Sequence, residues 1–163
     1  MRRILLTCTL AFTLLPVFGG EGKAPPMNKE KSLLIDYVDP FIGTTNFGTT
    51  NPGAVCPNGM MSVVPFNVMG SADNTYDKDA RWWSTPYEYT NCFFTGYSHV
   101  NLSGVGCPEL GSLLLMPTTG ELNVDYKEYG SKYKDEQASP GYYSNYLTKY
   151  NIKTEVSATP RTG

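Results

Sequence analysis

The residues best suited to chemistry are concentrated in the stretch Gly96–Gly111. It contains His99, the only histidine of the chain, together with Cys107 and Glu109, and it leads into the apolar run Ser112–Met116. Glycines at this density let a backbone adopt positive φ angles or approach another surface closely. We therefore expect a shaped loop carried by a rigid strand, which is a common location for binding residues.

Acidic residues are the next candidates, because acid–base catalysis and calcium binding both use carboxylates. Their spacing marks no catalytic pair. Asp73, Asp77 and Asp79 supply oxygen donors at short intervals but lack the EF-hand pattern, so a solvated acidic loop is the favoured interpretation. With one histidine and no C-x-x-C sequence, zinc binding is also disfavoured, and we expect no metal site. The candidate acids are Asp39, Asp73, Asp77, Asp79, Glu88, Glu109, Glu121 and Asp125.

Composition narrows the class of ligand. The formal net charge of −2 provides no basic field for nucleic acid or anionic lipid. The chain carries 12 Tyr, 7 Phe and 2 Trp, and exposed aromatic rings suit carbohydrate, whose CH faces stack on them. The alternative is that the tyrosines are present because they favour strands.

The two tryptophans are adjacent, at Trp82 and Trp83, within the charged segment Ser71–Asn91. That segment lacks a periodic apolar face, so burying both indoles together is difficult. We expect one ring to pack and the other to stand exposed.

The first twenty residues have the order of a secretory signal peptide. Arg2 and Arg3 precede the apolar run Ile4–Phe18, which is too short to span a membrane comfortably, and small residues follow it. We expect residues 1–20 to be removed on export. Residues 21–32 then form a disordered lead-in.

Export leaves three cysteines, Cys56, Cys92 and Cys107. Because the number is odd, at least one thiol is free or pairs with another chain. A disulfide between two of them is possible outside the cytoplasm. We favour buried free thiols.

Residues 33–163 have the signals of one all-β domain. Short strands separated by turns predict an antiparallel β-sandwich, and no amphipathic helix is evident. The long irregular segment Asp39–Cys56 favours a functional loop. The predicted strands are Leu33–Val38, Met60–Phe66, Leu110–Met116 (buried on both faces), and a hairpin made by Tyr142–Tyr150 and Ile152–Thr159 around Asn151.

The strand Ile152–Thr159 is followed by only four residues. A sandwich ending there would expose an unpaired edge, which natural proteins avoid. We therefore expect the sandwich to be incomplete at its C-terminal end, and the chain to be the front of a longer protein.

Several blocks together resemble the N-terminal domain of glycoside hydrolase family 92, the calcium-dependent exo-α-mannosidases of gut Bacteroidetes. They occur in the family's order and spacing over about Leu34–Gly163. The blocks are Tyr37-Val38-Asp39-Pro40-Phe41-Ile42-Gly43-Thr44, Pro52-Gly53-Ala54, Pro57-Asn58-Gly59-Met60, Tyr97-Ser98-His99, Leu102-Ser103-Gly104 and Gly106-Cys107-Pro108-Glu109-Leu110-Gly111.

The resemblance implies a β-sandwich followed by an (α/α)6 barrel, with the active site between them. For an exported chain it also implies the periplasm or outer surface of a Gram-negative bacterium. It implies hydrolysis of terminal α-linked mannose, including α-1,2-linked mannose of N-glycans, with inversion of configuration. Both catalytic carboxylates and most groups around the calcium ion are expected in the C-terminal domain. No catalytic residue or metal ligand is therefore assigned here, and this part alone is expected to be inactive.

The resemblance also suggests which residues contact sugar. In the family, a tryptophan of the N-terminal domain lines the leaving-group subsite, and Trp82 or Trp83 would be its counterpart. Packing is the alternative role for both. His99 is a candidate sugar contact or a structural histidine satisfied by backbone, and Phe47 is a candidate ring for stacking. Where family sequences often carry a second histidine, this chain has Asn101, which weakens metal binding by paired imidazoles.

Two other functions stay open. One is a free-standing, non-catalytic module that binds mannose. The other is a structural domain whose aromatic residues serve an interface with a partner.

Overall fold

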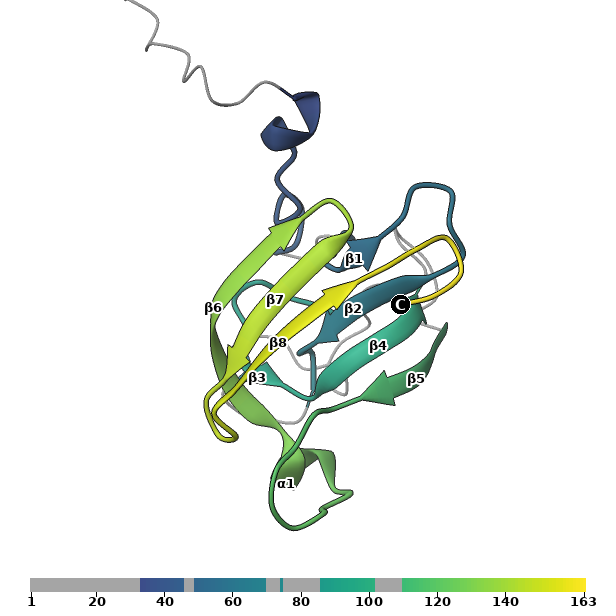
Figure 1. The fold of residues 1–163 in the computed structure, drawn as a ribbon. Helices are drawn as coiled ribbons and strands as arrows, with labels where there is room; N and C mark the ends of the chain where they lie inside the picture. The colour runs from purple at the N-terminus through teal and green to yellow at the C-terminus, as the bar shows by residue number, and fades with distance from the viewer. Residues whose placement is uncertain (1–32, 46–48, 70–73, 75–85, 102–109) are drawn as a thin grey trace, which may run out of the picture. The chain divides into compact units, whose positions relative to one another are not determined.

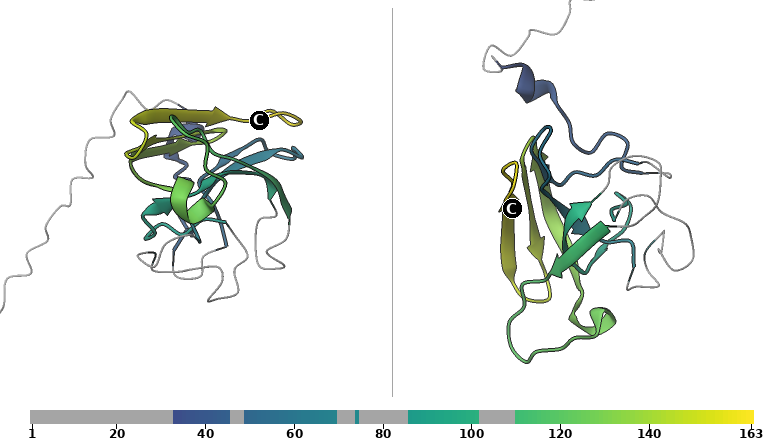
Figure 2. Two further views of the ribbon diagram at one scale, coloured as in Figure 1. Left: turned by 90° about the horizontal axis from the view of Figure 1, so that it is seen from below. Right: turned by 90° about the vertical axis from the view of Figure 1, so that its right-hand side faces the viewer.

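A computed structural model describes residues 33–45, 49–69, 74, 86–101 and 110–163, and Leu33–Gly163 form one compact unit. The described strands make two four-stranded antiparallel sheets (Figure 1). The sheets face each other as two layers (Figure 2). The predicted all-β antiparallel sandwich is confirmed.

The first sheet has the strand order β1-β2-β4-β5. The central strand β4 places His99 between Val63 of β2 and Leu113 of β5. The prediction of a loop starting at Gly96 is thus wrong for its first six residues, because they form strand β4, with an irregularity at Val100. The bounds are Ala54–Val55 for β1, Ser62–Phe66 for β2, Gly96–Asn101 for β4 and Leu110–Leu115 for β5.

The second sheet has the strand order β3-β6-β7-β8. The predicted hairpin is confirmed: β7 pairs with β8 along its whole length, and Asn151 has a φ of 56° at the turn. In β8 the side chain of Thr154 is buried, whereas Lys153 and Glu155 are exposed, as the alternation predicts. The bounds are Phe93–Phe94 for β3, Ser131–Ser139 for β6, Tyr142–Leu147 for β7 and Ile152–Ser157 for β8.

In the described part of the chain, two single-turn helices lie outside the sheets. The 3-10 helix η1 (Leu34–Tyr37) stands where a strand was predicted, so that prediction is wrong. The amide of Asp36 donates to the carbonyl of Leu33 at 3.1 Å, which closes a turn locally. The helix α1 (Tyr126–Tyr129) is capped by Asp125, which accepts from the amide of Lys127 at 2.9 Å. In the part of the chain that the structure describes, no helix has the length and apolar character to cross a membrane.

The hydrophobic core lies next to the point where the chain crosses from the second sheet (β3) to the first (β4). Strands β3 and β4 are separated by Thr95, whose amide donates to the carbonyl of Phe66 at 2.9 Å. Phe94 and Tyr97, on either side of this crossing, pack edge to face with ring centroids 4.9 Å apart. The buried residues of the hydrophobic core cluster are Ala54, Val63, Phe94, Tyr97, Tyr143 and Leu147.

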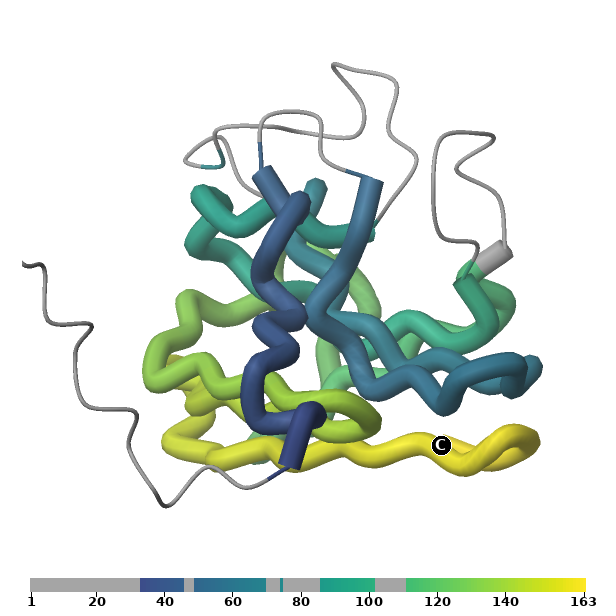
Figure 3. Tube along the Cα trace, turned by 90° about the horizontal axis from the view of Figure 1, so that it is seen from above, coloured from purple at the N-terminus to yellow at the C-terminus, as the bar shows by residue number. Residues whose placement is uncertain are grey.

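The strands β5 and β8 form free edges of the two sheets in the described ranges. Strand β8 contacts β1 of the other layer and runs beside the β1–β2 hairpin (Figure 3). Leu113 and Leu115 of β5 are 51% and 50% exposed. The prediction that Leu110–Met116 is buried on both faces is therefore wrong, because β5 has one neighbouring strand and its inner face is only partly covered.

Candidate functional site

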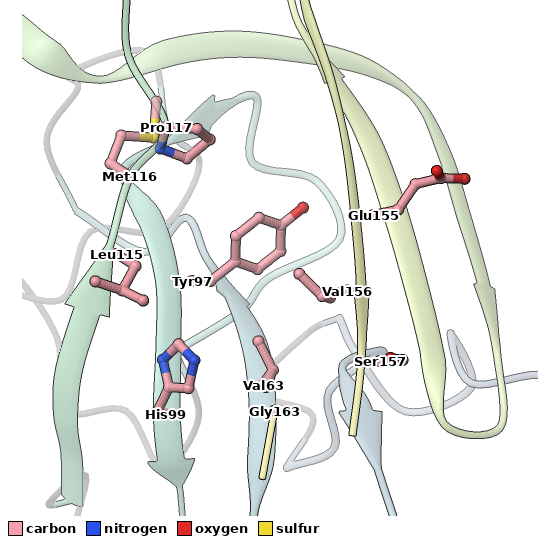
Figure 4. A pocket seen from close by; sticks show the side chains of 10 residues that line it. All are labelled: Val63, Tyr97, His99, Leu115, Met116, Pro117, Glu155, Val156, Ser157 and Gly163. Carbon is pink, nitrogen blue, oxygen red and sulfur yellow. The ribbon is translucent and has the colours of Figure 1, made fainter. Parts of the chain in front are cut away.

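A pocket of about 550 Å³ opens between the two sheets, beside the free edge of β8. Side chains of β2, β4 and β5 form one wall, and β8 forms the other (Figure 4). The wall of the first sheet is mainly apolar, with a single imidazole. The residues that line the pocket include Val63, Tyr97, His99 and Leu115 on the first sheet, Val156 on β8, and Gly163.

His99 is the only predicted site residue that falls in the described ranges. Its side chain is 9% exposed, and its Nδ1 lies 3.4 Å from the carbonyl oxygen of Leu113. A proton on Nδ1 donates to that carbonyl and leaves Nε2 as an acceptor. The imidazole thus fastens β4 to the edge strand β5 by its side chain and also lines the pocket.

Among the described residues that line the pocket, the carboxylate is that of Glu155. Glu155 turns its side chain away from the space between the sheets (Figure 4). Its carboxylate accepts from Tyr142 at 2.6 Å and from Lys153 at 2.9 Å. Both hydrogen bonds lower the pKa of Glu155, and the bond from Tyr142 has the larger effect. The pocket offers van der Waals contact and one imidazole, and nothing in it pairs an acid with a base.

The sandwich interior contains a carboxylate that the sequence did not reveal. Strand β6 has a bulge between Lys134 and Gln137, where Asp135 has a φ of 53°. The extra residue lets Glu136 turn inward while Gln137 stays opposite Ser144. No period-2 pattern in this charged run could have marked Glu136 as an inward residue.

Two phenols bind this partly buried acid. Glu136 Oε1 accepts from Tyr143 at 2.5 Å and from Tyr87 at 2.8 Å. Burial raises the pKa of Glu136, and these two hydrogen bonds oppose the rise. Burial also raises the pKa values of Tyr87 and Tyr143, so both phenols stay protonated as donors.

A second cluster of polar side chains, made by Tyr97, Asn145 and Thr154, joins the two sheets across the core. The hydroxyl of Tyr97 on β4 hydrogen-bonds Thr154 Oγ1 on β8 at 2.6 Å and donates to Asn145 Oδ1 on β7 at 3.2 Å. Thr154 also donates to Asn145 Oδ1. Since buried polar groups need partners, this triad fixes the relative position of the layers beside the pocket.

A third cluster anchors the segment that follows the predicted tryptophan site. Asn67 is fully buried, and its Nδ2 donates to the carbonyl of Glu88 at 2.9 Å and to Tyr133 Oη at 2.7 Å. Its Oδ1 accepts from the amide of Glu88 at 2.8 Å. Its own carbonyl accepts from Asn91 at 2.8 Å and from Asn74 at 3.0 Å. This cluster holds residues 86–91 firmly against the end of β2.

Glu88 belongs to this cluster and is 1% exposed. Its Oε1 accepts from the hydroxyl of Thr90 at 3.1 Å. The carboxylate therefore stabilises its own turn and is turned away from solvent. It has the position of a structural acid, although the sequence offered it as a candidate for chemistry.

The other predicted site residues, Trp82, Trp83 and Phe47, lie outside the described residues, as do Cys107 and Glu109. Cys56 and Cys92 are free thiols, as favoured, but both are partly exposed, so the expectation that they are buried is wrong. Within the described ranges, no three His, Cys, Asp or Glu side chains gather closely enough to hold a metal ion.

Comparison with solved structures identifies similar folds. The family 92 α-mannosidase BT3965 of Bacteroides thetaiotaomicron has a TM-score of 0.63 and 32% identity, covering 77% of this chain and 17% of that one. Its complex with mannoimidazole has a TM-score of 0.64 and 34% identity over 77% and 16%. The family 92 inverting mannosidase BT2199 of the same species has a TM-score of 0.54 and 26% identity over 77% and 16%.

This chain thus spans 16–17% of the length of these relatives. A search of curated proteins gave no significant match. The profile of the glycosyl hydrolase family 92 N-terminal domain matches residues 37–163, almost the whole described unit. The chain therefore belongs to glycosyl hydrolase family 92, through the N-terminal domain of that family.

Proposed function

We propose that this chain is the N-terminal part of an exported, calcium-dependent, inverting exo-α-mannosidase that removes α-1,2-linked mannose from N-glycans. The observation that carries the proposal is the match of the family 92 N-terminal domain to residues 37–163. The 32–34% identity to an α-mannosidase over 77% of the chain supports it further.

The described carboxylates support a non-catalytic role for this part. An inverting glycosidase needs a carboxylic acid and a carboxylate about 6.5–9.5 Å apart, both facing the sugar. Glu88 and Glu136 are instead bound to neighbouring hydroxyls inside the domain. We propose that the catalytic pair belongs to a C-terminal (α/α)6 domain, and that the 163 residues alone are inactive.

Calcium is expected of the longer protein. A calcium ion takes six to eight oxygen ligands, usually including several carboxylates. The described residues do not fit this requirement, since no cluster of three acidic, His or Cys groups occurs among them. We therefore assign no calcium ligand to the described part.

The contribution proposed for this part is the leaving-group subsite and the contact with the C-terminal domain. Trp82 or Trp83 provides a ring at the subsite, with Phe47 and His99 as further sugar contacts. The polar cluster around Asn67 supports this assignment, because it binds Glu88 and Asn91 in the segment 86–91, which begins three positions after Trp83.

Kinetics of the longer protein on α-1,2-mannobiose test the proposal. We expect calcium-dependent hydrolysis with inversion, and a loss of about tenfold in kcat/KM for Trp82→Ala or Trp83→Ala, equivalent to about 1.4 kcal/mol. Tyr126→Ala, on the short helix α1, serves as the aromatic control. Wild-type kinetics in both tryptophan variants would remove the subsite role.

Glycan binding by the 163-residue chain decides between this function and the free-standing mannose-binding module. Titration with mannose oligosaccharides, followed by calorimetry, is expected to show no binding. Binding that persists without any hydrolase activity in the longer protein would favour the module.

A further inference from the structure

The connection between β1 and β2 contains an exposed asparagine followed directly by a glycine. The chain turns from Cys56 to Gly59, where the amide of Gly59 donates to the carbonyl of Cys56 at 2.9 Å. Pro57 takes the second position of this turn, and Asn58 takes the third with a φ of 58°. A proline followed by a residue of positive φ is the pattern of a type II β-turn. Asn58 is exposed at the tip of the turn.

The fold restricts both members of this pair. A positive φ disfavours most side chains, and asparagine tolerates it better than almost any residue except glycine. At the next position, a Cβ on Gly59 would lie 2.9 Å from the carbonyl oxygen of Cys56 and 2.9 Å from the Cα of Pro160. Both contacts are with backbone atoms, so the close approach needs glycine. The Asn-Gly pair therefore follows from the packing of the turn.

An asparagine before a glycine can react with its own backbone. The backbone nitrogen of the glycine attacks the side-chain Cγ of the asparagine and forms a C–N bond. The proton of that nitrogen leaves with the side-chain amide nitrogen as ammonia, which closes a five-membered cyclic imide. Water then opens the imide at either carbonyl, which gives aspartate or isoaspartate. Glycine favours the attack, because no side chain shields its nitrogen and its backbone is conformationally free.

The folded turn holds the attacking nitrogen away from this reaction. The N–H of Gly59 is bound to Cys56, and the next two amides, those of Met60 and Met61, donate to the carbonyl of Pro160 at 2.9 and 3.3 Å. These bonds fasten the turn to the segment that follows β8, which runs beside it (Figure 3). The reaction therefore requires local opening of the turn, a smaller change than unfolding of the whole domain.

We propose that Asn58 is a site of spontaneous deamidation through a cyclic imide with Gly59, and that opening of the turn controls its rate. Water is the only co-reactant. Both products add a negative charge at the turn. Isoaspartate also lengthens the main chain between β1 and β2, whose pairing involves two residues of β1. The proposal does not rest on the proposed glycosidase function, because the chemistry belongs to the turn itself.

Peptide mapping of the wild-type chain is the first test. The chain is incubated folded and urea-unfolded in the same mildly alkaline buffer. Chromatography with mass spectrometry then separates the asparagine, aspartate and isoaspartate forms of the peptide that contains residue 58. We expect both products in the folded chain, at a rate lower than in the unfolded chain by about tenfold or more. Equal rates would overturn control by the turn, and no product in the folded chain would overturn the site.

Asn151 is an internal control in the same digest. It is exposed, has a φ of 56° and lies in the turn between β7 and β8, but its successor is Ile152. Because the branched side chain of Ile152 shields the backbone nitrogen, Asn151 should stay unmodified in the folded chain. Modification of Asn151 at the rate of Asn58 would show that exposure decides the reaction, and would overturn the role of the Asn-Gly pair.

Two proline variants test the opening of the turn. Pro57→Ala removes the fixed φ that preorganises the turn. It should raise the rate at Asn58 severalfold in the folded chain and leave the rate in the unfolded chain unchanged. Pro140→Ala, in the turn between β6 and β7, is the matched control for a general loss of stability. Equal acceleration by both variants, or none by Pro57→Ala, would contradict opening of this turn as the controlling step.

Discussion

Tyr143 on β7 donates a hydrogen bond of 2.5 Å to Glu136 on the neighbouring strand β6, inside the sandwich. Tyr87 binds the same carboxylate oxygen at 2.8 Å, and burial first, then the nearby phenol of Tyr133, raises the pKa of Tyr87. Burial raises the pKa of Glu136 above its ordinary value of 4.5 despite these bonds. The carboxylate is thus a structural group whose ionisation opposes folding.

This arrangement predicts the pH dependence of stability. Because the folded pKa is raised, the folded protein binds the proton more tightly than the unfolded chain. The resulting stabilisation is complete below the ordinary value and is lost as pH rises through the folded pKa. Glu136→Gln cannot ionise, so it should gain stability relative to wild type from pH 4 to pH 8, by about 1.4 kcal/mol per pKa unit of the shift. Urea unfolding at several pH values measures this difference.

Glu155→Gln is the contrasting control. The pKa of Glu155 is lowered by Tyr142 and Lys153, so its stabilisation is present above the ordinary value and is lost as pH falls. The free energy of unfolding of Glu155→Gln should therefore fall relative to wild type as pH rises. For Glu136→Gln the same difference should rise. A stability difference between wild type and Glu136→Gln that is constant with pH would show that the buried acid does not titrate as described.

The hairpin and the sandwich were predictable from local patterns. Strict alternation over Ile152–Ser157 and the turn residue Asn151 specify β8 and its pairing without tertiary information. Strand β6 was not predictable, because its charged residues hide a bulge at Asp135 that turns Glu136 inward. The apolar run Leu110–Met116 predicts a strand buried on both faces, since periodicity cannot reveal whether a strand lies at an edge.

The candidate site was less accessible from the sequence. The motif around His99 pointed to the family, but its glycines concealed that β4 begins at Gly96 and is central in its sheet. The cluster of Asn67 and Glu88 joins residues 21 positions apart. Such a contact depends on how loops return to the sheet, and no local spacing encodes it.

The Asn67 cluster leads to a prediction on stability. Asn67→Ala removes one acceptor and two donor interactions, including those that hold the backbone of Glu88. With net values near 1 kcal/mol each and buried partners left unpaired, the loss should be about 3 kcal/mol in the free energy of unfolding. Urea denaturation of the 163-residue chain measures it.

Asn123→Ala is the control for this prediction, because Asn123 also accepts a backbone hydrogen bond, from Asp125 at 2.8 Å, but at an exposed position. Its effect should stay within about 0.5 kcal/mol. Equal effects of the two substitutions would show that burial of the Asn67 cluster contributes nothing to stability.

Two glycines are needed for different reasons: Gly53 because a side chain would clash with neighbouring backbone, and Gly120 because of its positive φ angle. A Cβ on Gly53 would lie 2.5 Å from the carbonyl oxygen of Val63 and 2.8 Å from the Cα of Val64, both in the backbone of β2. The close approach of β1 to β2 therefore needs glycine at this position. Gly120 has a φ of 88° and nothing within 4 Å of the added Cβ, so substitution there introduces backbone strain alone.

We expect Gly120→Ala to reduce the free energy of unfolding by about 1 kcal/mol, the cost of a left-handed conformation for an L-residue. Gly53→Ala should cost more than about 2 kcal/mol, because backbone atoms cannot move aside as a flexible side chain does. Thermal unfolding of both variants at one pH gives the comparison. A smaller loss at Gly53 than at Gly120 would mean that β1 can shift away from β2. The two-residue pairing of β1 with β2 would then not hold the preceding loop in place.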